Sequence, residues 1–191
     1  MKSILPASLA ILVLSITSLT RADTYEAKAG MSYIIFKTVH FGVNPAYGRF
    51  DDFSGTLTGD AESPETFEIS FEAVVDSINT GIQKRDDHLR GPDFFNSKEF
   101  PTVSFKSTSV TAVEGEEDKF TVTGDLTMLG ITKPVTATFH YYGTGKSMSG
   151  DDLAGGEATF SVKRTDFGMN YGVPGIGDDV EIMVSLQGYK Q

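Results

Sequence analysis

The chain has 191 residues, of which 26 are acidic and 16 are Lys or Arg, so its formal net charge at pH 7 is −10. Nucleic acid is a poor partner for such a chain, because its phosphates are bound by clustered basic residues. The sequence contains no cysteine, which excludes disulfides, a thiolate nucleophile and acylation of a cysteine. The length is that of a single ordinary domain with its own hydrophobic core.

The N-terminus has the features of a secretory signal peptide. Lys2 precedes an apolar stretch at 4–19, and small residues suited to cleavage follow it. We therefore predict a leader over residues 1–22 and one mature domain over 23–191, located in the periplasm or the medium. Cleavage after Ala29 is an alternative. A transmembrane anchor is another, but no stable anchor is expected, because the stretch is close to the minimum of about 17 residues for a spanning helix.

Beyond the leader, apolar and polar residues alternate with the period of two that is typical of half-buried β-strands. Phe67 and Ile69, for example, alternate with Glu68 and Ser70. In chain order, this pattern predicts strands over 33–41, 53–58, 67–75, 103–110, 120–128, 135–141, 158–162 and 180–186. Two stretches rich in glycine and acidic residues, 114–118 and 143–156, are predicted to be hairpin loops.

One segment between two predicted strands is predicted to be helical instead of extended. Residues 82–90 contain no Gly, Pro or Val, and Gly91-Pro92 would end a helix of about two turns. The predicted fold class is therefore all-β, with about eight antiparallel strands and a short helical insertion. Such a sheet can close into a barrel that holds side chains or one slender ligand. A two-sheet sandwich would show the same alternation.

The insertion and the segments around it carry a dense set of motifs. They are Ser77-Ile78-Asn79-Thr80-Gly81, Arg85-Asp86-Asp87-His88-Leu89-Arg90, Asp93-Phe94-Phe95 and Phe100-Pro101-Thr102, with further matching segments at 48–55, 122–127, 130–135 and 164–169. In this order they resemble the YceI-like family of exported, polyisoprenoid-binding proteins. The resemblance implies a lipocalin-like barrel with an elongated apolar tunnel and the insertion near one end. Met31 and Leu129 depart from it, since the family would have histidine at both positions.

The same resemblance implies that the apolar strand faces line a tunnel for a long isoprenoid chain, whose hydrocarbon suits an apolar tube. The candidate tunnel residues are Phe71, Phe105, Val122, Leu126, Phe139, Phe160, Ile182 and Val184. A filled core built from the same residues is the alternative, because alternation does not distinguish a packed interior from a void.

Charged residues concentrate within the insertion, at 85–90. His88 and Arg90 are the candidates for contact with the polar head group of a lipid. The alternative is a purely structural helix, in which Asp86 and Arg90 pair at four-residue spacing and Leu89 packs over the barrel end.

Motifs for catalysis, a metal or a nucleotide cofactor are not evident. The three histidines lie far apart in the chain, and there is no nucleophile elbow, phosphate loop or dinucleotide fingerprint. The predicted function is therefore carriage or storage of a polyisoprenoid lipid, such as a quinone or a prenyl phosphate, without catalytic residue, metal or cofactor. One rival is a stress-response interaction protein whose barrel is a scaffold without lipid. Another is a hydrolase or isomerase that uses His88 with Asp86 or Asp87.

Overall fold

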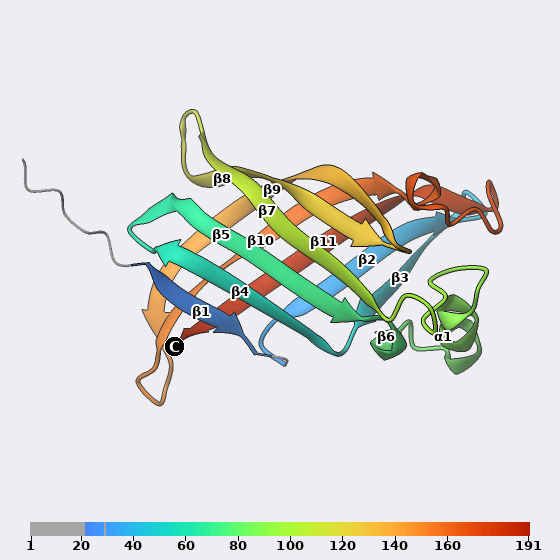
Figure 1. Cartoon of the computed structure of the whole chain (residues 1–191), viewed down its shortest axis with the longest axis horizontal. Coiled ribbons are helices and arrows are strands. Elements are labelled where there is room, and N and C mark those ends of the chain that lie inside the picture. The colour runs from blue at the N-terminus through green and yellow to red at the C-terminus, as the bar shows by residue number, and fades with distance from the viewer. Residues whose placement is uncertain (1–21, 29) are drawn as a thin grey trace, which may run out of the picture.

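The computed structural model describes residues 22–28 and 30–191, which form one antiparallel sheet and one short α-helix (Figure 1). The strands are β1 Asp23–Ala27, β2 Tyr33–His40, β3 Asn44–Phe50, β4 Phe53–Asp60, β5 Ser63–Val74, β6 Ile78–Asn79, β7 Thr102–Val113, β8 Glu116–Met128, β9 Ile131–Lys146, β10 Asp152–Lys163 and β11 Ile176–Lys190. The helix α1 spans Gln83–Arg90, close to the predicted 82–90. The predicted leader, apart from Ala22, lies outside the described residues.

Eight of the strands close into a ring. In order they are β1, β4, β5, β7, β8, β9, β10 and β11, and β1 pairs with β11. Tyr25 of β1 shows the closure, because it lies opposite Leu57 of β4 on one side and opposite Lys190 of β11 on the other. The prediction of an antiparallel barrel with a short helical insertion is confirmed.

Three strands extend the sheet beyond the ring. β2 follows β1 along one edge of β11, and β3 and then β6 pair beyond it. The strand predicted over 33–41 is β2, so the ring is completed by β1 instead. Alternation does not predict β1, β3 or β6, because β1 and β6 are short and β3 contains Pro45 and Gly48, which are unusual in strand interiors.

The predicted loops are shorter than the sequence suggests. β9 continues to Lys146 and β10 begins at Asp152, so most of 143–156 is strand, with a bulge between Gly155 and Gly156. β8 likewise begins at Glu116, inside the predicted loop 114–118. Glycine and acidic residues have low strand propensity, but pairing with neighbouring strands overrides this preference.

Aromatic rings inside the barrel lie against glycines of neighbouring strands. Phe36 covers Gly48, which is directly opposite it, and Phe139 covers Gly156. A Cβ atom at either glycine would overlap the ring, so these positions need glycine for space. Glycines thus make room for large aromatic side chains both in the ring, at Gly156 of β10, and in the extension, at Gly48 of β3.

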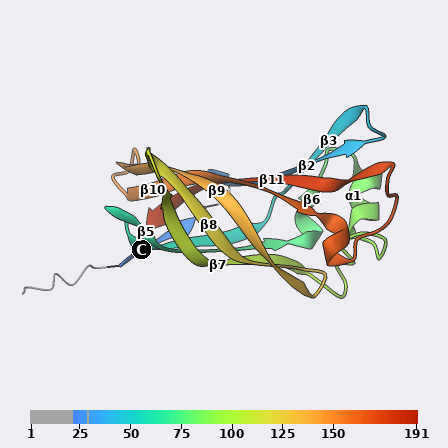
Figure 2. The same cartoon turned by 90° about the horizontal axis from the view of Figure 1, so that it is seen from above.

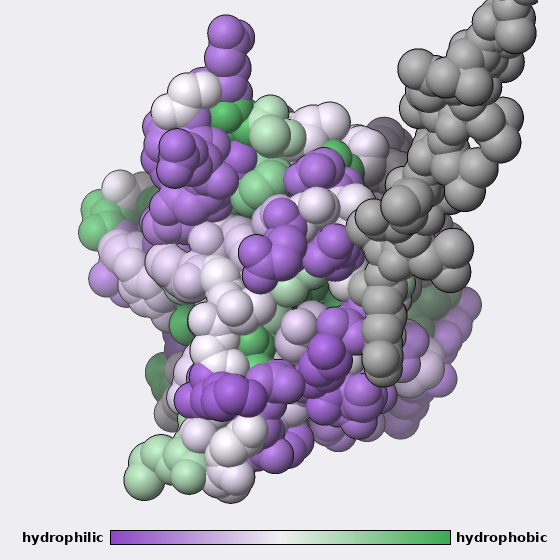
Figure 3. All heavy atoms as spheres, turned by 90° about the vertical axis from the view of Figure 1, so that its left-hand side faces the viewer, coloured by the Kyte–Doolittle hydropathy of each residue, from purple (hydrophilic) through white to green (hydrophobic). Residues whose placement is uncertain are grey.

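The two ends of the barrel differ. α1, the β2–β3 hairpin and the segment before β11 gather at one end, while the C-terminus lies at the other (Figures 1 and 2). Figure 3 looks onto that other end, where hydrophilic side chains predominate on the visible surface. Within residues 22–28 and 30–191, no helix is long and apolar enough to cross a membrane.

Candidate functional site

The helix α1 is held against the barrel end by a polar network around Thr80. The buried Asp86 carboxylate accepts hydrogen bonds from the backbone N–H of Thr80, at 2.9 Å, and from its hydroxyl group. Arg85 donates from Nε to the Thr80 hydroxyl and from Nη2 to the Thr80 carbonyl, both at 2.7 Å. The first two charged positions of the insertion motif, Arg85 and Asp86, thus hold the chain segment that precedes the helix.

Arg90 ties the other end of the helix to the same segment. Its Nε donates to the carbonyl oxygen of Asp76 and its Nη2 to that of Ile78, both at 2.9 Å. Its Nη1 bonds the carboxylate of Asp87 at 3.0 Å. The predicted pair between Asp86 and Arg90 is therefore wrong: Asp86 is turned inward to Thr80, and Arg90 pairs with the residue three positions before it.

His88 lies on the opposite side of the helix, nearly half exposed. Its Nε2 is 2.9 Å from a carboxylate oxygen of Asp93. Its ring makes edge-on contacts with the rings of Phe94 and Tyr171, at centroid distances of 4.9 and 5.1 Å, and those two rings are 5.3 Å apart. This aromatic cluster connects the insertion to the segment before β11.

A second polar anchor joins the insertion to the bend between β3 and β4. The Asp51 carboxylate accepts hydrogen bonds from Asn79, at 2.7 Å, and from Arg49. These bonds, the one from Asn79 first, hold the pKa of Asp51 below its ordinary value. Asp51 also donates its backbone N–H to Ser77. The motif at 48–55 and the motif at 77–81 therefore form one structural unit.

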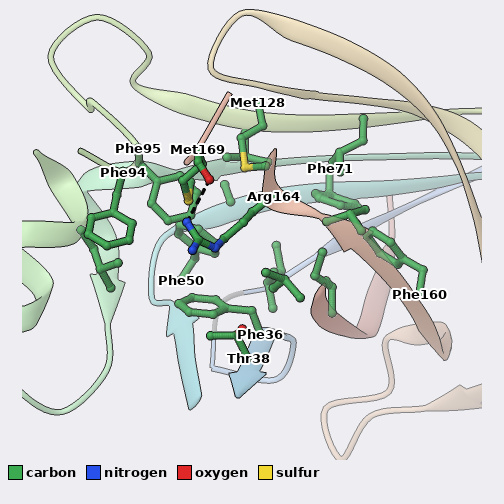
Figure 4. Close-up of a pocket in the computed structure, with 18 of the residues that line it drawn as sticks. Phe36, Thr38, Phe50, Phe71, Phe94, Phe95, Met128, Phe160, Arg164 and Met169 are labelled. Carbon is green, nitrogen blue, oxygen red and sulfur yellow. Dashed lines mark hydrogen bonds between the residues drawn. The ribbon is translucent and has the colours of Figure 1, made fainter. Parts of the chain in front are cut away.

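Beneath this unit, the barrel contains an apolar cavity of about 110 Å³ (Figure 4). Its exposed wall consists of apolar atoms. The lining comes from β2, β3, β5, β7, β8, β10, β11, α1 and the loops after α1 and β10, and includes Ile34, Phe36, Phe50, Phe71, Ala73, Leu89, Phe94, Phe95, Leu126, Met128, Phe160, Met169, Ile176 and Ile182. Leu89 packs over the barrel end, as the sequence predicts for this residue.

Arg164 forms one edge of the cavity without exposing its charge there. This side chain is buried, and it donates from Nε to Gly177, from Nη1 to Met169 and from Nη2 to Ile176, each to a carbonyl oxygen at 2.9 Å. Burial lowers the pKa of the Arg164 guanidinium, and the nearby Asp178 carboxylate opposes that shift. The guanidinium therefore braces the loop between β10 and β11, and its hydrocarbon stem joins the apolar wall.

The eight predicted tunnel residues are all in the barrel interior but are divided between two cavities. Phe71, Leu126, Phe160 and Ile182 line the 110 Å³ cavity. Phe105, Val122, Phe139 and Val184, together with Phe71 and Phe160, line a void of about 20 Å³ deeper in the barrel. A further void of about 10 Å³, bordered by Phe139, lies toward the β1 end.

Of the predicted head-group residues, His88 lines an outer groove and Arg90 is engaged with backbone carbonyls. The groove has a volume of about 460 Å³ and lies between α1, the β2–β3 hairpin and Tyr171. It shares five lining residues with the apolar cavity, namely Phe36, Thr38, Leu89, Phe94 and Ile176. The groove therefore adjoins the apolar cavity, and Lys84, Arg85 and His88 add charged or polar groups to its largely apolar wall.

Sequence analysis misses the aromatic and thioether part of the cavity wall. Phe36 and Phe50 lie on strands of the extension, and Phe94 and Phe95 lie in the irregular segment after α1, where no periodicity indicates an inward side chain. The adjacent aromatic residues of the motif Asp93-Phe94-Phe95 were the available signal for these two positions.

The two positions at which histidine would be expected are used differently here. Met31 is exposed, and Leu129 occupies the turn between β8 and β9 with a positive φ of 52°. Among the described residues, no group of three or more His, Asp or Glu side chains lies together in a way that could hold a metal ion.

Comparison with known sequences matches residues 25–188 to the YceI-like domain. Protein YceI of Escherichia coli O157:H7 is 35% identical over all of this chain and 98% of its own length. Protein YceI of Salmonella arizonae (strain ATCC BAA-731 / CDC346-86 / RSK2980) is 34% identical with the same coverage.

Solved structures show the same fold. The YCEI protein of Campylobacter jejuni aligns with a TM-score of 0.72 at 25% identity, over 80% of this chain and 90% of that one. BcnA of Burkholderia cenocepacia gives a TM-score of 0.74 at 23% identity, over 84% and 98%. A polyisoprenoid binding domain from Saccharophagus degradans gives 0.66 at 18% identity, over 87% and 98%. The sequence match over nearly the whole described chain, together with this fold, shows that the protein belongs to the YceI-like family.

Proposed function

We propose that this protein is exported and binds a polyisoprenoid lipid, of the quinone or prenyl type, inside its barrel for carriage or storage. The observation that carries the proposal is the apolar cavity of about 110 Å³ within a closed barrel. Water gains no hydrogen bonds from such a wall, whereas each buried methylene of a hydrocarbon chain contributes about 0.8 kcal/mol. An apolar chain is therefore the ligand class that this cavity favours.

The outer groove supports a polar head group on the same ligand. Lys84, Arg85 and His88 line it beside Tyr47 and Tyr171. Cationic and hydroxyl donors of this kind suit the oxygens of a quinone or of a phosphate. In this proposal His88 contacts the head group, while Arg90 supports the site by holding α1 in place.

Relatives and sequence support the ligand class and the location separately. The domain from Saccharophagus degradans is described as polyisoprenoid binding, and it shares the fold of this chain. The predicted leader over 1–22 would direct the protein to the periplasm, where an insoluble lipid needs a protein to cross water. The proposal assigns no catalytic residue to the site.

Thermal melts with and without a polyprenyl quinone test the proposal. A ligand that binds only the folded state, at about 100 times its Kd, adds about 2.7 kcal/mol of stability, which corresponds to roughly 5–10 °C in Tm for a domain of this size. We expect Ala73→Leu, which places a larger side chain in the 110 Å³ cavity, to raise the Tm of the ligand-free protein and to reduce the shift caused by the quinone.

Thr159→Leu, on the exposed face of β10, is the matched control and should leave the quinone-dependent shift unchanged. If the parent protein shows no quinone-dependent shift, the carrier proposal fails and the scaffold rival is favoured. A shift that Ala73→Leu leaves intact would show that the lipid binds elsewhere.

A further inference from the structure

Exposed apolar side chains gather around the mouth of the barrel. At the tip of the β2–β3 hairpin, Val39, Phe41 and Val43 are 46, 68 and 86% exposed. Tyr171 and Val173, in the loop before β11, are also exposed. Phe41 joins the two groups, because its backbone N–H donates to the carbonyl of Gly175 in that loop. We call these five residues the rim; Figure 2 shows the hairpin projecting at the same end as α1.

Folding does not explain Phe41. Its φ is 51° and that of Gly42 is 71°, so both lie in the left-handed region at the hairpin turn. Asn, Asp and Gly are the residues that such a turn favours, and a bulky aromatic residue with positive φ is an outlier. The ring of Phe41 contacts His40 and lies against Gly175, but it is 68% exposed and so buries little apolar area in return for this conformation, which indicates a role outside the isolated fold.

The rim is also free of negative charge, although the chain is acidic. None of the 26 Asp and Glu residues lies in 27–50 or in 167–177, the two segments that carry the rim. The opposite end of the barrel is mainly hydrophilic on the surface seen in Figure 3. Burying a carboxylate against a partner costs free energy, and these two segments contain none. Contact through the rim therefore avoids a cost that contact through the acidic strands would carry.

We propose that the rim docks on the surface of a phospholipid bilayer and places the mouth of the barrel against it, so that the lipid enters and leaves without crossing water. This inference rests on the proposed function, because an isoprenoid lipid resides in a bilayer. Val39, Phe41 and Val43 project from the tip of the hairpin. A narrow apolar tip inserts between lipid head groups more readily than it packs against a flat protein surface. Tyr171, beside the tip, is the type of residue that lies at the membrane interface.

Flotation with vesicles of phosphatidylcholine tests the docking surface without reference to the cargo. The variant Phe41→Asn/Val43→Asn removes two apolar side chains, keeps the net charge and gives position 41 a residue that tolerates its φ. Tyr142→Asn/Met148→Asn makes matched changes at two exposed residues away from the mouth. We expect the rim variant to partition onto vesicles at least tenfold more weakly than the parent, and the control to partition like the parent.

Transfer of a polyprenyl quinone between donor and acceptor vesicles should slow by a similar factor in the rim variant alone. Binding of the same quinone from detergent, without vesicles, should be equal in all three proteins, because Phe41 and Val43 do not line the cavity. Failure of the parent to bind quinone in detergent would refute the proposed function. Flotation would still test whether the rim binds vesicles, because that assay does not depend on the cargo.

Several results would overturn the docking proposal. One is parent protein that does not float, and another is equal flotation of the parent and the rim variant. A third is a dimer in sedimentation that dissociates only in the rim variant, which would show that a second copy of the chain covers this surface. An unchanged or higher Tm of the rim variant confirms that a loss of flotation does not come from unfolding.

Discussion

At the scale of single residues, Phe71 and Phe160 determine how far the open interior extends. Both line the 110 Å³ cavity on one side and the 20 Å³ void on the other, so their rings form the partition between them. The ring of Phe71 stacks on that of Phe105 at 5.3 Å, which fixes its orientation. A long isoprenoid chain would pass this point only if one of the two rings turned aside.

We therefore expect Phe160→Ala to join the two cavities. In the ligand-free protein the change should cost about 3–5 kcal/mol, through lost burial and a larger void. The affinity for a long polyprenyl chain should rise relative to that for a short one, because the partition is gone. Titrations with quinones of two chain lengths, together with melts of the ligand-free protein, measure both effects.

Phe67→Ala is the matched control, since Phe67 is also buried but lies near the start of β5, where it packs on Tyr141. It should lower stability without changing the preference for chain length. A Phe160→Ala variant with unaltered chain-length preference would mean that the chain does not pass Phe160.

Alternation identifies inward residues well, because it depends only on the pleat of each strand. All eight predicted tunnel residues face the interior, but the sequence could not assign them to separate cavities. That division depends on strand register and on rings such as Phe36 and Phe94, which belong to the extension and the insertion.

At the scale of elements, α1 is positioned by hydrogen bonds more than by burial. Arg90 bonds the carbonyls of Asp76 and Ile78, and Asp86 bonds Thr80. The sequence predicts the helix from its bounds and the Gly91-Pro92 stop, but it pairs Asp86 with Arg90 incorrectly. Spacing along a helix says which side chains are neighbours; it does not show that the preceding segment offers better partners.

Replacing Arg90 by Met should show whether this residue holds α1 in place or contacts the head group of the lipid. The variant keeps the apolar stem but loses the two hydrogen bonds to backbone carbonyls. A hydrogen bond from a charged group contributes about 1.5–3 kcal/mol when it is buried, and each of these contributes less because the side chain is partly exposed. We expect a lower Tm and an unchanged preference among head groups. Lys84→Met, in the groove, should leave the Tm unchanged. A change of head-group preference in Arg90→Met would show that Arg90 contacts the head group, as the sequence analysis predicts.

The Asp51 anchor predicts a pH dependence. Because its folded-state pKa lies below the ordinary value of 3.8, its contribution to stability is present above about pH 4 and is lost as the pH falls through the lowered pKa. Asp51→Asn should therefore lower the Tm at pH 7 and flatten the decline of Tm below about pH 4. The effect should be about 1 kcal/mol or less, since the pair is exposed. Asp52→Asn, measured in parallel, controls for the lost charge; equal profiles for both variants would argue against the anchor.

At the scale of the whole molecule, the barrel is closed at one end by β1 and widened at the other by the β2–β3 extension and α1. The sequence predicts the barrel class and the insertion. Of the extension it predicts β2 but not β3 or β6, because Pro45 and Gly48 break the strand pattern of β3 and β6 is only two residues long. The groove and the cavity both depend on this extension, so the site is less predictable than the fold.

The central claim is that the barrel holds an isoprenoid lipid, and a solvent extract of the protein tests it most directly. Protein purified from its native host without detergent is extracted, and the extract is analysed by mass spectrometry beside that of the Ala73→Leu variant. We expect a polyisoprenoid in the parent extract at close to equimolar amount, and much less in the variant. A parent extract with no isoprenoid above the level of an unrelated periplasmic protein would contradict the claim.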